Sequence, residues 1–260
     1  MKIGVFDSGL GGLTVVQAMT KVIKGAELFY IADTKNAPYG EKTPEQILKY
    51  SLEITQYFID THQIDALIVA CNTATSAAIQ YLRKHYPFLI IIGTEPGIKP
   101  AIELTRTGKV GVLATPATLK GDKYQQLANE LALEKDIVLF EQACPGLVEQ
   151  IEKGKIYADQ TRVMLESWLA PMRENNVDAI VLGCTHYPLV SHTIESIMQT
   201  KVYLIQTGDA IAQHLLTLAQ KKGHYNDGEL KIILYSTDTI DKQIVGHILQ
   251  GHIEVEQIDI

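Results

Sequence analysis

The chain has 260 residues, of which 46% are hydrophobic and 20% are charged, and its formal net charge is −7. This composition predicts a folded core, and the negative charge argues against non-specific binding to nucleic acids or anionic membranes. Three cysteines are too few for a secreted disulfide framework, and the chain shows neither a signal peptide nor a hydrophobic run of transmembrane length. We therefore expect a soluble cytoplasmic protein.

Short hydrophobic runs alternate along the chain with segments of helical character. The runs lie at residues 3–6, 28–32, 66–70, 89–92, 110–114, 137–140, 179–182, 202–205, 230–235 and 253–255. Alternation of strands and helices is typical of α/β proteins whose mostly parallel sheets are flanked by helices. We expect this fold class.

Two helix starts can be recognised between the runs. Thr43 and Pro44, with Gln46, predict an N-cap followed by proline in the first turn and a capping-box partner. Thr115 and Pro116 repeat this start after the fifth run. In the helix after Thr43, one apolar face is expected to contain Leu48, Leu52, Phe58 and Ile59.

Two segments, ALIVACNTAT (66–75) and AIVLGCTHYP (179–188), share one pattern. In each, a hydrophobic run ends at a cysteine that is followed by a threonine within two residues. This echo predicts two similar α/β domains with the active site in the cleft between them. We expect residues 1–96 plus 207–260 to form the first domain and residues 97–206 the second.

Ligands of open α/β sheets bind beyond the carboxyl ends of the strands, so the residues that follow each run are candidates for a site. They suit a small zwitterion or dicarboxylate, because they offer hydroxyls, amides and backbone donors with few cations. The candidates are Asp7, Ser8, Asp33, Pro38, Tyr39, Gly40, Cys71, Asn72, Thr73, Thr115, Thr118, Cys184, Thr185 and His186.

Several of these residues also have purely structural interpretations. Asp7 and Ser8 could cap the first helix, residues 38–40 could be only a turn, and the polar residues at 72, 73 and 185 could be helix caps. A dinucleotide-binding loop at glycines 9, 11 and 12 is not supported, because Thr14 stands where the G-x-G-x-x-G pattern requires its last glycine.

The two cysteines at equivalent strand ends point to chemistry, whereas Cys144 matches neither segment and is expected to be structural. Zinc binding by Cys71, Cys184, His186 and His192 lacks a characteristic spacing, and a cytoplasmic disulfide is disfavoured. The remaining option is a pair of acid/base thiols that remove a proton from one face of a carbon and return one to the other. This chemistry defines a racemase or epimerase, in which neighbouring acidic or imidazole groups would assist the thiols.

The chain resembles the glutamate racemases of the aspartate/glutamate racemase family. The resemblance rests, in order, on GVFDSGLGGLTV, ADTKNAPYG, IVACNTAT, GTEPGIKPA, VGVLATPATLKGDKY, LVE and VLGCTHYPL. It implies a cofactor-independent enzyme without a metal that interconverts L- and D-glutamate for peptidoglycan synthesis. It also implies a homodimer, and the short N-terminus suggests no activation by a peptidoglycan precursor.

The resemblance further implies roles for individual residues. Cys71 would act on D-glutamate and Cys184 on L-glutamate, and Asp7, His186 and Glu149 would assist them. The substrate would contact Asp7, Ser8, Pro38, Tyr39, Gly40, Asn72, Thr73, Thr115, Thr118, Thr185 and His186. Many family members carry Arg in place of Lys35, for which we expect a surface position.

Three alternatives stay open at this point. The nearest is a related racemase that acts on aspartate or a hydantoin, although aspartate racemases tend to have Glu at the position of His186. The second is a two-lobed protein that binds a small molecule without chemistry. The third is a metal hydrolase.

Overall fold

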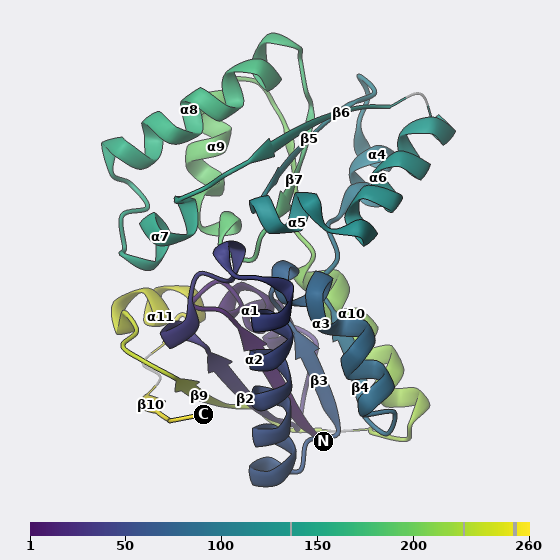
Figure 1. The fold of residues 1–260 in the computed structure, drawn as a ribbon, viewed down its shortest axis with the longest axis vertical. Helices are drawn as coiled ribbons and strands as arrows, with labels where there is room; N and C mark the ends of the chain where they lie inside the picture. Colours follow the sequence, from purple (N-terminus) through teal and green to yellow (C-terminus); the bar gives the residue numbers. More distant parts are fainter. Residues whose placement is uncertain (136, 226, 252–253) are drawn as a thin grey trace. The chain divides into compact units, whose positions relative to one another are not determined.

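In the computed structural model, which describes residues 1–135, 137–225, 227–251 and 254–260, the chain divides into two compact units. Unit 1 contains residues 1–94 and 207–260, and unit 2 contains residues 95–206. Figure 1 labels most of their helices and strands. Each unit is an α/β structure built on its own sheet, so each is described separately.

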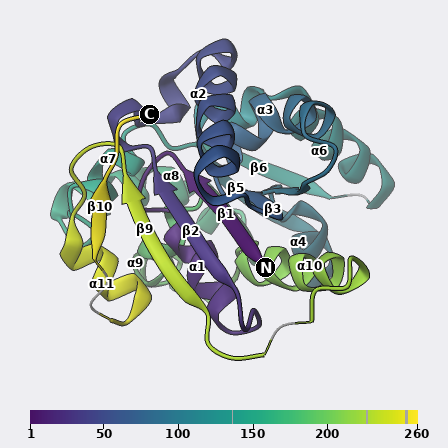
Figure 2. The same ribbon diagram turned by 90° about the horizontal axis from the view of Figure 1, so that it is seen from below.

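The described residues of unit 1 form a six-stranded sheet in the order β10-β9-β2-β1-β3-β4, and every pair of neighbours is parallel. Figure 2 shows β9, β2 and β1 side by side. The strands are β1 (Lys2–Asp7), β2 (Glu27–Ala32), β3 (Ala66–Val69), β4 (Ile90–Gly93), β9 (Lys231–Ser236) and β10 (Val255–Gln257).

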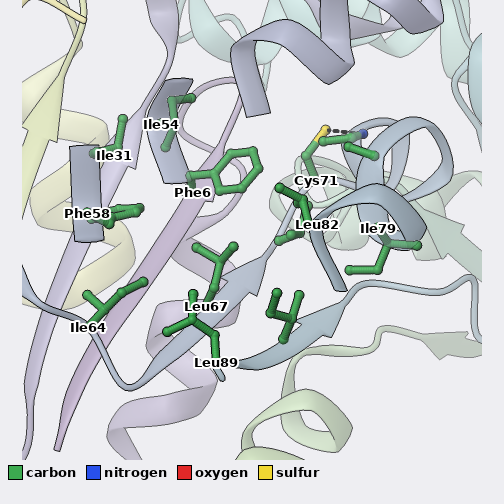
Figure 3. Close-up of a cluster of buried hydrophobic side chains, with 14 of the residues drawn as sticks. Phe6, Ile31, Ile54, Phe58, Ile64, Leu67, Cys71, Ile79, Leu82 and Leu89 are labelled. Atoms are coloured by element: carbon green, nitrogen blue, oxygen red, sulfur yellow. Dashed lines mark hydrogen bonds between the residues drawn. The ribbon is translucent and has the colours of Figure 1, made fainter. Parts of the chain in front are cut away.

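Helices cover both faces of this sheet (Figure 2). One face carries α2 (Pro44–Tyr57) and α3 (Asn72–His85), and the other carries α1 (Leu13–Thr20), α10 (Gly208–Lys221) and α11 (Lys242–Leu249). Three short helical turns complete the unit: η1 (Thr34–Asn36), η2 (Tyr39–Glu41) and η3 (Phe58–His62). Beneath α2 and α3, Phe6, Ile31 and Leu67 form part of the buried core shown in Figure 3.

Unit 2 has a four-stranded parallel sheet in the order β6-β5-β7-β8 within the described residues. Its elements are β5 (Lys109–Ala114), β6 (Val138–Ala143), β7 (Ala179–Gly183), β8 (Tyr203–Ile205), α4 (Ile98–Leu104), α5 (Pro116–Lys120), α6 (Asp122–Lys135), α7 (Leu147–Glu152), α8 (Asp159–Glu174), η4 (Tyr187–Val190) and α9 (Ser191–Met198). Alternate residues of β7 enter different cores: Val181 packs with α4, whereas Ile180 and Leu182 pack with α8 and α9. Strands that are buried on both faces explain the continuous hydrophobic runs.

The predicted fold class, α/β with two parallel sheets flanked by helices, is confirmed. Every predicted run corresponds to a strand, with shifts of a few residues at the ends. The last run overlaps its strand only at Val255, where β10 begins; Ile253, where the predicted run began, lies outside the described residues. No helix in the described part of the chain is both long enough and apolar enough to cross a membrane.

Both predicted helix starts are also confirmed. The Thr43 side chain accepts a hydrogen bond from the backbone N–H of Gln46, and the side-chain oxygen of Gln46 accepts one from the backbone N–H of Thr43. At the second start, Thr115 accepts from the N–H of Thr118. These caps satisfy backbone donors that have no partner inside the helix.

The predicted apolar face of α2 is confirmed only in part. Phe58 is fully buried and Ile59 packs against the same core, although both lie in η3, directly after α2. Leu48 and Leu52 are only partly buried, whereas Ser51 and Thr55 are fully buried among apolar residues. Their hydroxyls donate to backbone carbonyls one turn earlier, at 2.8 Å for Ser51 and 2.6 Å for Thr55. Because the helix itself satisfies these polar groups, they can be buried without other partners.

Candidate active site

The candidate residues of unit 1 leave the carboxyl ends of adjacent strands. In the sheet register Asp7 lies opposite Ala32, and Phe6 lies opposite Val69. The segments that begin at Asp7, Asp33 and Cys71 therefore emerge next to one another. Parallel pairing of β1 with both neighbours is what brings these distant parts of the sequence to one edge of the sheet.

Cys71 is buried and is the N-cap residue of α3. Its Sγ accepts a hydrogen bond from the backbone N–H of Ala74 at 3.5 Å, as Figure 3 shows at the end of the unit 1 core. A thiolate in this position would be favoured by the positive end of the helix. Asn72 and Thr73 are the first residues of α3, so the interpretation of either as its cap is wrong.

Asp7 is fully buried, and its Oδ2 accepts from the N–H of Gly9 at 2.9 Å. The predicted alternative, that Asp7 or Ser8 caps the first helix, is wrong, because α1 begins at Leu13 and its N-cap is Gly12. A side chain at position 12 would clash, since an added Cβ would lie 2.5 Å from Cβ of Asp7. The glycines here allow the loop to pack closely around the buried carboxylate.

The segment at 38–40 is more than a turn. Tyr39 begins η2, is 1% exposed, and donates its hydroxyl to Oδ2 of Asp33 at 2.6 Å. Burial is the main cause that raises the pKa of the Tyr39 phenol well above its usual value, and the negative charges of Asp33, Cys71 and Asp7 add to it. Tyr39 therefore remains a neutral phenol among the acidic groups of this strand edge.

In unit 2, Cys184 follows directly after β7 and is one member of a connected chain of three side chains. His186 Nδ1 lies 3.7 Å from Cys184 Sγ, and His186 Nε2 lies 2.5 Å from Glu152 Oε1. The thiol and the imidazole are buried, and the carboxylate is one-fifth exposed. Carboxylate, imidazole and thiol thus lie in a row, in which the imidazole can exchange a proton with the thiol and the carboxylate can balance the charge on the imidazole.

The pKa of His186 is raised well above its usual value. Burial, the largest single effect, lowers this pKa, but hydrogen bonds to Cys184 and Glu152 and the negative charges of these two groups outweigh it. The raised pKa favours the imidazolium form of His186. This form gives unit 2 a positive charge beside the thiol, in a set of candidates that looked poor in cations from the sequence.

The sequence reasoning chose Glu149 as the assisting acid, but the structure brings Glu152 to His186. The two glutamates lie one helical turn apart on α7. Glu149 is half-buried, and its charge acts on the phenol of Tyr187. Spacing of three residues places both on one side of a helix, so the sequence carried a signal for Glu152 that was not used.

The remaining candidates of unit 2 also lie at strand ends. Ala114 pairs with Gly183, so Thr115 and Cys184 begin adjacent segments. The hydroxyls of Thr115 and Thr118 are 2.9 Å apart, and both residues are buried. Thr185 is buried, and its hydroxyl lies 3.5 Å from Nδ1 of His186, so it is not a helix cap.

Cys144 packs in the core of unit 2 with Cys184 and Tyr187. Burial raises the pKa of the Cys144 thiol to about 12, so it stays protonated. All three cysteines are free thiols. Within the described residues, no group of three or more His, Cys, Asp or Glu side chains is arranged to hold a metal ion, so the zinc alternative gains no support.

Comparison with known proteins identifies the family. Residues 3–215 match the model of the Asp/Glu/Hydantoin racemase family. This chain belongs to that racemase family. A glutamate racemase of Sulfurovum sp. is 66% identical over 96% of this chain and 94% of its own length.

Two solved structures resemble this racemase-family chain over nearly all of its length. A glutamate racemase of Bacillus anthracis has 30% sequence identity and a TM-score of 0.87, covering 99% of this chain and 97% of its own. The glutamate racemase of Francisella tularensis in complex with D-glutamate has 26% identity and a TM-score of 0.84, covering 100% of this chain and 97% of its own.

Proposed function

We propose that this protein is a cofactor-independent glutamate racemase that interconverts L- and D-glutamate. The observation that carries the proposal is the pair of buried thiols, each at the carboxyl end of a strand and each with its own supporting groups. Cys71 has the N-terminus of α3, and Cys184 has the imidazolium of His186, which is backed by Glu152. We infer glutamate as the substrate because the similar proteins are glutamate racemases.

The proposed reaction balances with two thiols and one substrate. For L-glutamate, the thiolate of Cys184 removes the proton from the α-carbon and becomes a thiol. The thiol of Cys71 then gives a proton to the opposite face of the carbon and becomes a thiolate. For D-glutamate the roles reverse. The proposal requires that Cys71 and Cys184 address opposite faces of the α-carbon.

Removal of the α-proton is difficult, because this proton is a very weak acid. The surrounding groups must therefore stabilise the transition state. Negative charge that develops on the carbanion and the substrate carboxylates must be stabilised by fixed donors. We assign this role to the backbone N–H groups and hydroxyls at Ser8, Gly40, Asn72, Thr73 and Thr185. His186 is assigned to assist Cys184, which its ring faces, and Asp7 is assigned to assist Cys71.

We further propose the cellular setting that goes with this activity. The enzyme would act in the cytoplasm as a homodimer and supply D-glutamate for peptidoglycan synthesis. Thr115, Thr118 and Pro38 would complete the contacts with the substrate.

A substrate screen tests the proposal against its rivals. The purified protein is incubated with each enantiomer of glutamate, aspartate and a substituted hydantoin, and optical activity is followed by circular dichroism. We expect the signal of L- and D-glutamate to decay to zero without added cofactor or metal. Decay with aspartate or the hydantoin alone would place the enzyme in the same family with another substrate. A folded protein that binds glutamate but leaves every signal constant would instead be a binding protein.

A further inference from the structure

Thr237 lies next to the candidate site although it is near the end of the sequence and outside the residues that match the family model. Strand β9 pairs with β2 in a register that places Ser236 opposite Ala32. The next residues, Thr237 and Asp33, therefore leave two adjacent strands together. The backbone N–H of Thr237 continues the pairing by donating to the carbonyl of Ala32 at 3.0 Å.

The hydroxyl of Thr237 holds one side of the Asp33 carboxylate. It donates to Oδ1 at 2.8 Å, while Tyr39 donates to Oδ2 at 2.6 Å, and the Asn36 amide reaches both oxygens at 3.1 Å. Asp33 is 2% exposed, Tyr39 1% and Thr237 6%. A buried carboxylate needs several donors, and the donors on its two oxygens fix its orientation.

The same hydroxyl also holds the backbone of the following segment. Thr237 Oγ1 accepts from the N–H of Lys35 at 3.0 Å, and the N–H of Asp238 donates to Oγ1 of Thr34 at 2.9 Å. Farther out, Lys35 Nζ pairs with Asp259 at 2.8 Å on the surface, as expected for its position. The C-terminal part of unit 1 thus fastens the segment that leads from Asp33 to Tyr39.

We propose that Thr237 is a positioning residue for substrate binding. It orients Asp33 and, through Asp33 and the backbone of Lys35, places the Tyr39–Gly40 segment that holds the substrate. The inference rests on the proposed function, because that function assigns the substrate contacts to Tyr39 and Gly40. It goes further by giving a binding role to a residue in the C-terminal segment, which carries none of the recognised motifs.

The role predicts an effect on binding more than on chemistry. Thr237→Val keeps the size of the side chain but removes both the donor to Asp33 and the acceptor for Lys35. The side-chain hydrogen bonds of Thr237 both lie on the segment that begins at Asp33, rather than on either thiol. We therefore expect the KM for glutamate to rise about tenfold in both directions, with kcat within about threefold of the wild type, because a misplaced binding segment weakens ground state and transition state alike.

The test compares four single variants and one double variant with the wild type in a two-direction racemisation assay and in thermal unfolding. Thr237→Val should show the rise in KM, and Thr237→Ser, which keeps the hydroxyl, should restore KM to within about twofold. Thr55→Val is the matched control, since Thr55 is also buried in unit 1 but bonds only a carbonyl of its own helix. It should leave KM unchanged. Asp33→Asn should raise KM. In the double variant the rise in KM should be smaller than the product of the two single effects, because the two side chains share one hydrogen bond.

A second measurement does not depend on activity. Hydrogen exchange at the Lys35 amide should be at least about tenfold faster in Thr237→Val than in the wild type, and unchanged in Thr237→Ser. Absence of racemisation by the wild-type protein would refute the proposed function, whatever the exchange rates. An unchanged KM in Thr237→Val, in an enzyme that does racemise glutamate, would refute this inference alone. A KM effect equal to that of Thr55→Val would also overturn it, because general destabilisation would then explain the result.

Discussion

Nε2 of His186 lies 2.5 Å from Oε1 of Glu152, while the other ring nitrogen of His186 faces the sulfur of Cys184. The two thiols of this racemase-family protein are therefore supported in different ways. Cys184 has a charged imidazole backed by a carboxylate, whereas Cys71 has the N-terminal turn of a helix. An enzyme that works in both directions can have chemically unequal halves, provided that each half supports its own thiol.

The first prediction separates the two glutamates of α7. Glu152→Gln should lower kcat about 10- to 100-fold, because groups that orient and charge a functional histidine usually contribute that much. Glu149→Gln is the matched control on the same helix and should stay within about threefold of the wild type. Both are measured in the L-to-D and D-to-L directions. The opposite ranking would restore Glu149 as the assisting acid.

The second prediction concerns the charge of His186. Nitrogen NMR of labelled protein should show an imidazolium at neutral pH, because the pKa of His186 is raised by Cys184 and Glu152 against the opposing effect of burial. In Glu152→Gln the pKa should fall. A neutral His186 ring in the wild type at about pH 7, above its unperturbed pKa, would contradict the account of this cluster.

The same shift predicts how stability depends on pH. A histidine whose pKa is raised in the folded state stabilises the fold fully below its unfolded pKa of about 6.5, and that contribution is lost as pH rises through the folded value. The difference in unfolding free energy between wild type and Glu152→Gln should therefore shrink as pH is raised above neutral. A difference that grows with pH would contradict a raised pKa of His186 in the folded state.

His62 should affect the pH dependence of stability in the opposite sense to His186. Its ring is stacked on Phe29 at 3.9 Å, and burial first, then the charge of Lys2, lowers its pKa against a smaller effect of Glu27. Its contribution to stability is present above the unfolded pKa of about 6.5 and is lost as pH falls toward the folded value. His62→Phe should reduce the loss of unfolding free energy on acidification.

The capping box of α2 gives a prediction about stability alone. Thr43→Ala removes the side-chain acceptor for the N–H of Gln46 and should lower the unfolding free energy by about 1 kcal/mol. Thr43→Ser keeps a hydroxyl oxygen as acceptor, so its unfolding free energy should fall much less. Chemical denaturation measures both. Equal losses of unfolding free energy in the two variants would mean that the hydrogen bond of the cap is not the cause of the destabilisation.

The strands and the two thiols could be predicted because local sequence determines them. A hydrophobic run that ends at a cysteine, as before Cys71 and Cys184, identifies both the strand and the edge of the sheet where the thiol lies. The same is true of Thr43, whose cap depends only on the next three residues. Each of these features depends on a stretch of about ten residues or fewer.

The contacts that sequence reasoning missed depend on tertiary packing. Local sequence does not tell which of two glutamates on one helix turns toward His186, because that depends on how α7 packs in the core of unit 2. Thr237 is separated from Asp33 by 204 residues, and only the insertion of β9 beside β2 brings them together. Likewise, Ser51 and Thr55 look like solvent-facing positions until their hydroxyls are seen to bond within α2.

Proton NMR of glutamate in deuterated water tests the central claim most directly. Wild-type protein without added cofactor should remove the α-proton signal from either enantiomer while optical activity decays to zero. Cys71→Ser and Cys184→Ser, each shown to be folded, should slow both processes by on the order of a thousandfold, since each thiol serves as acid or base in both directions. Full retention of the α-proton by folded wild type, or full activity of either serine variant, would contradict the two-thiol account.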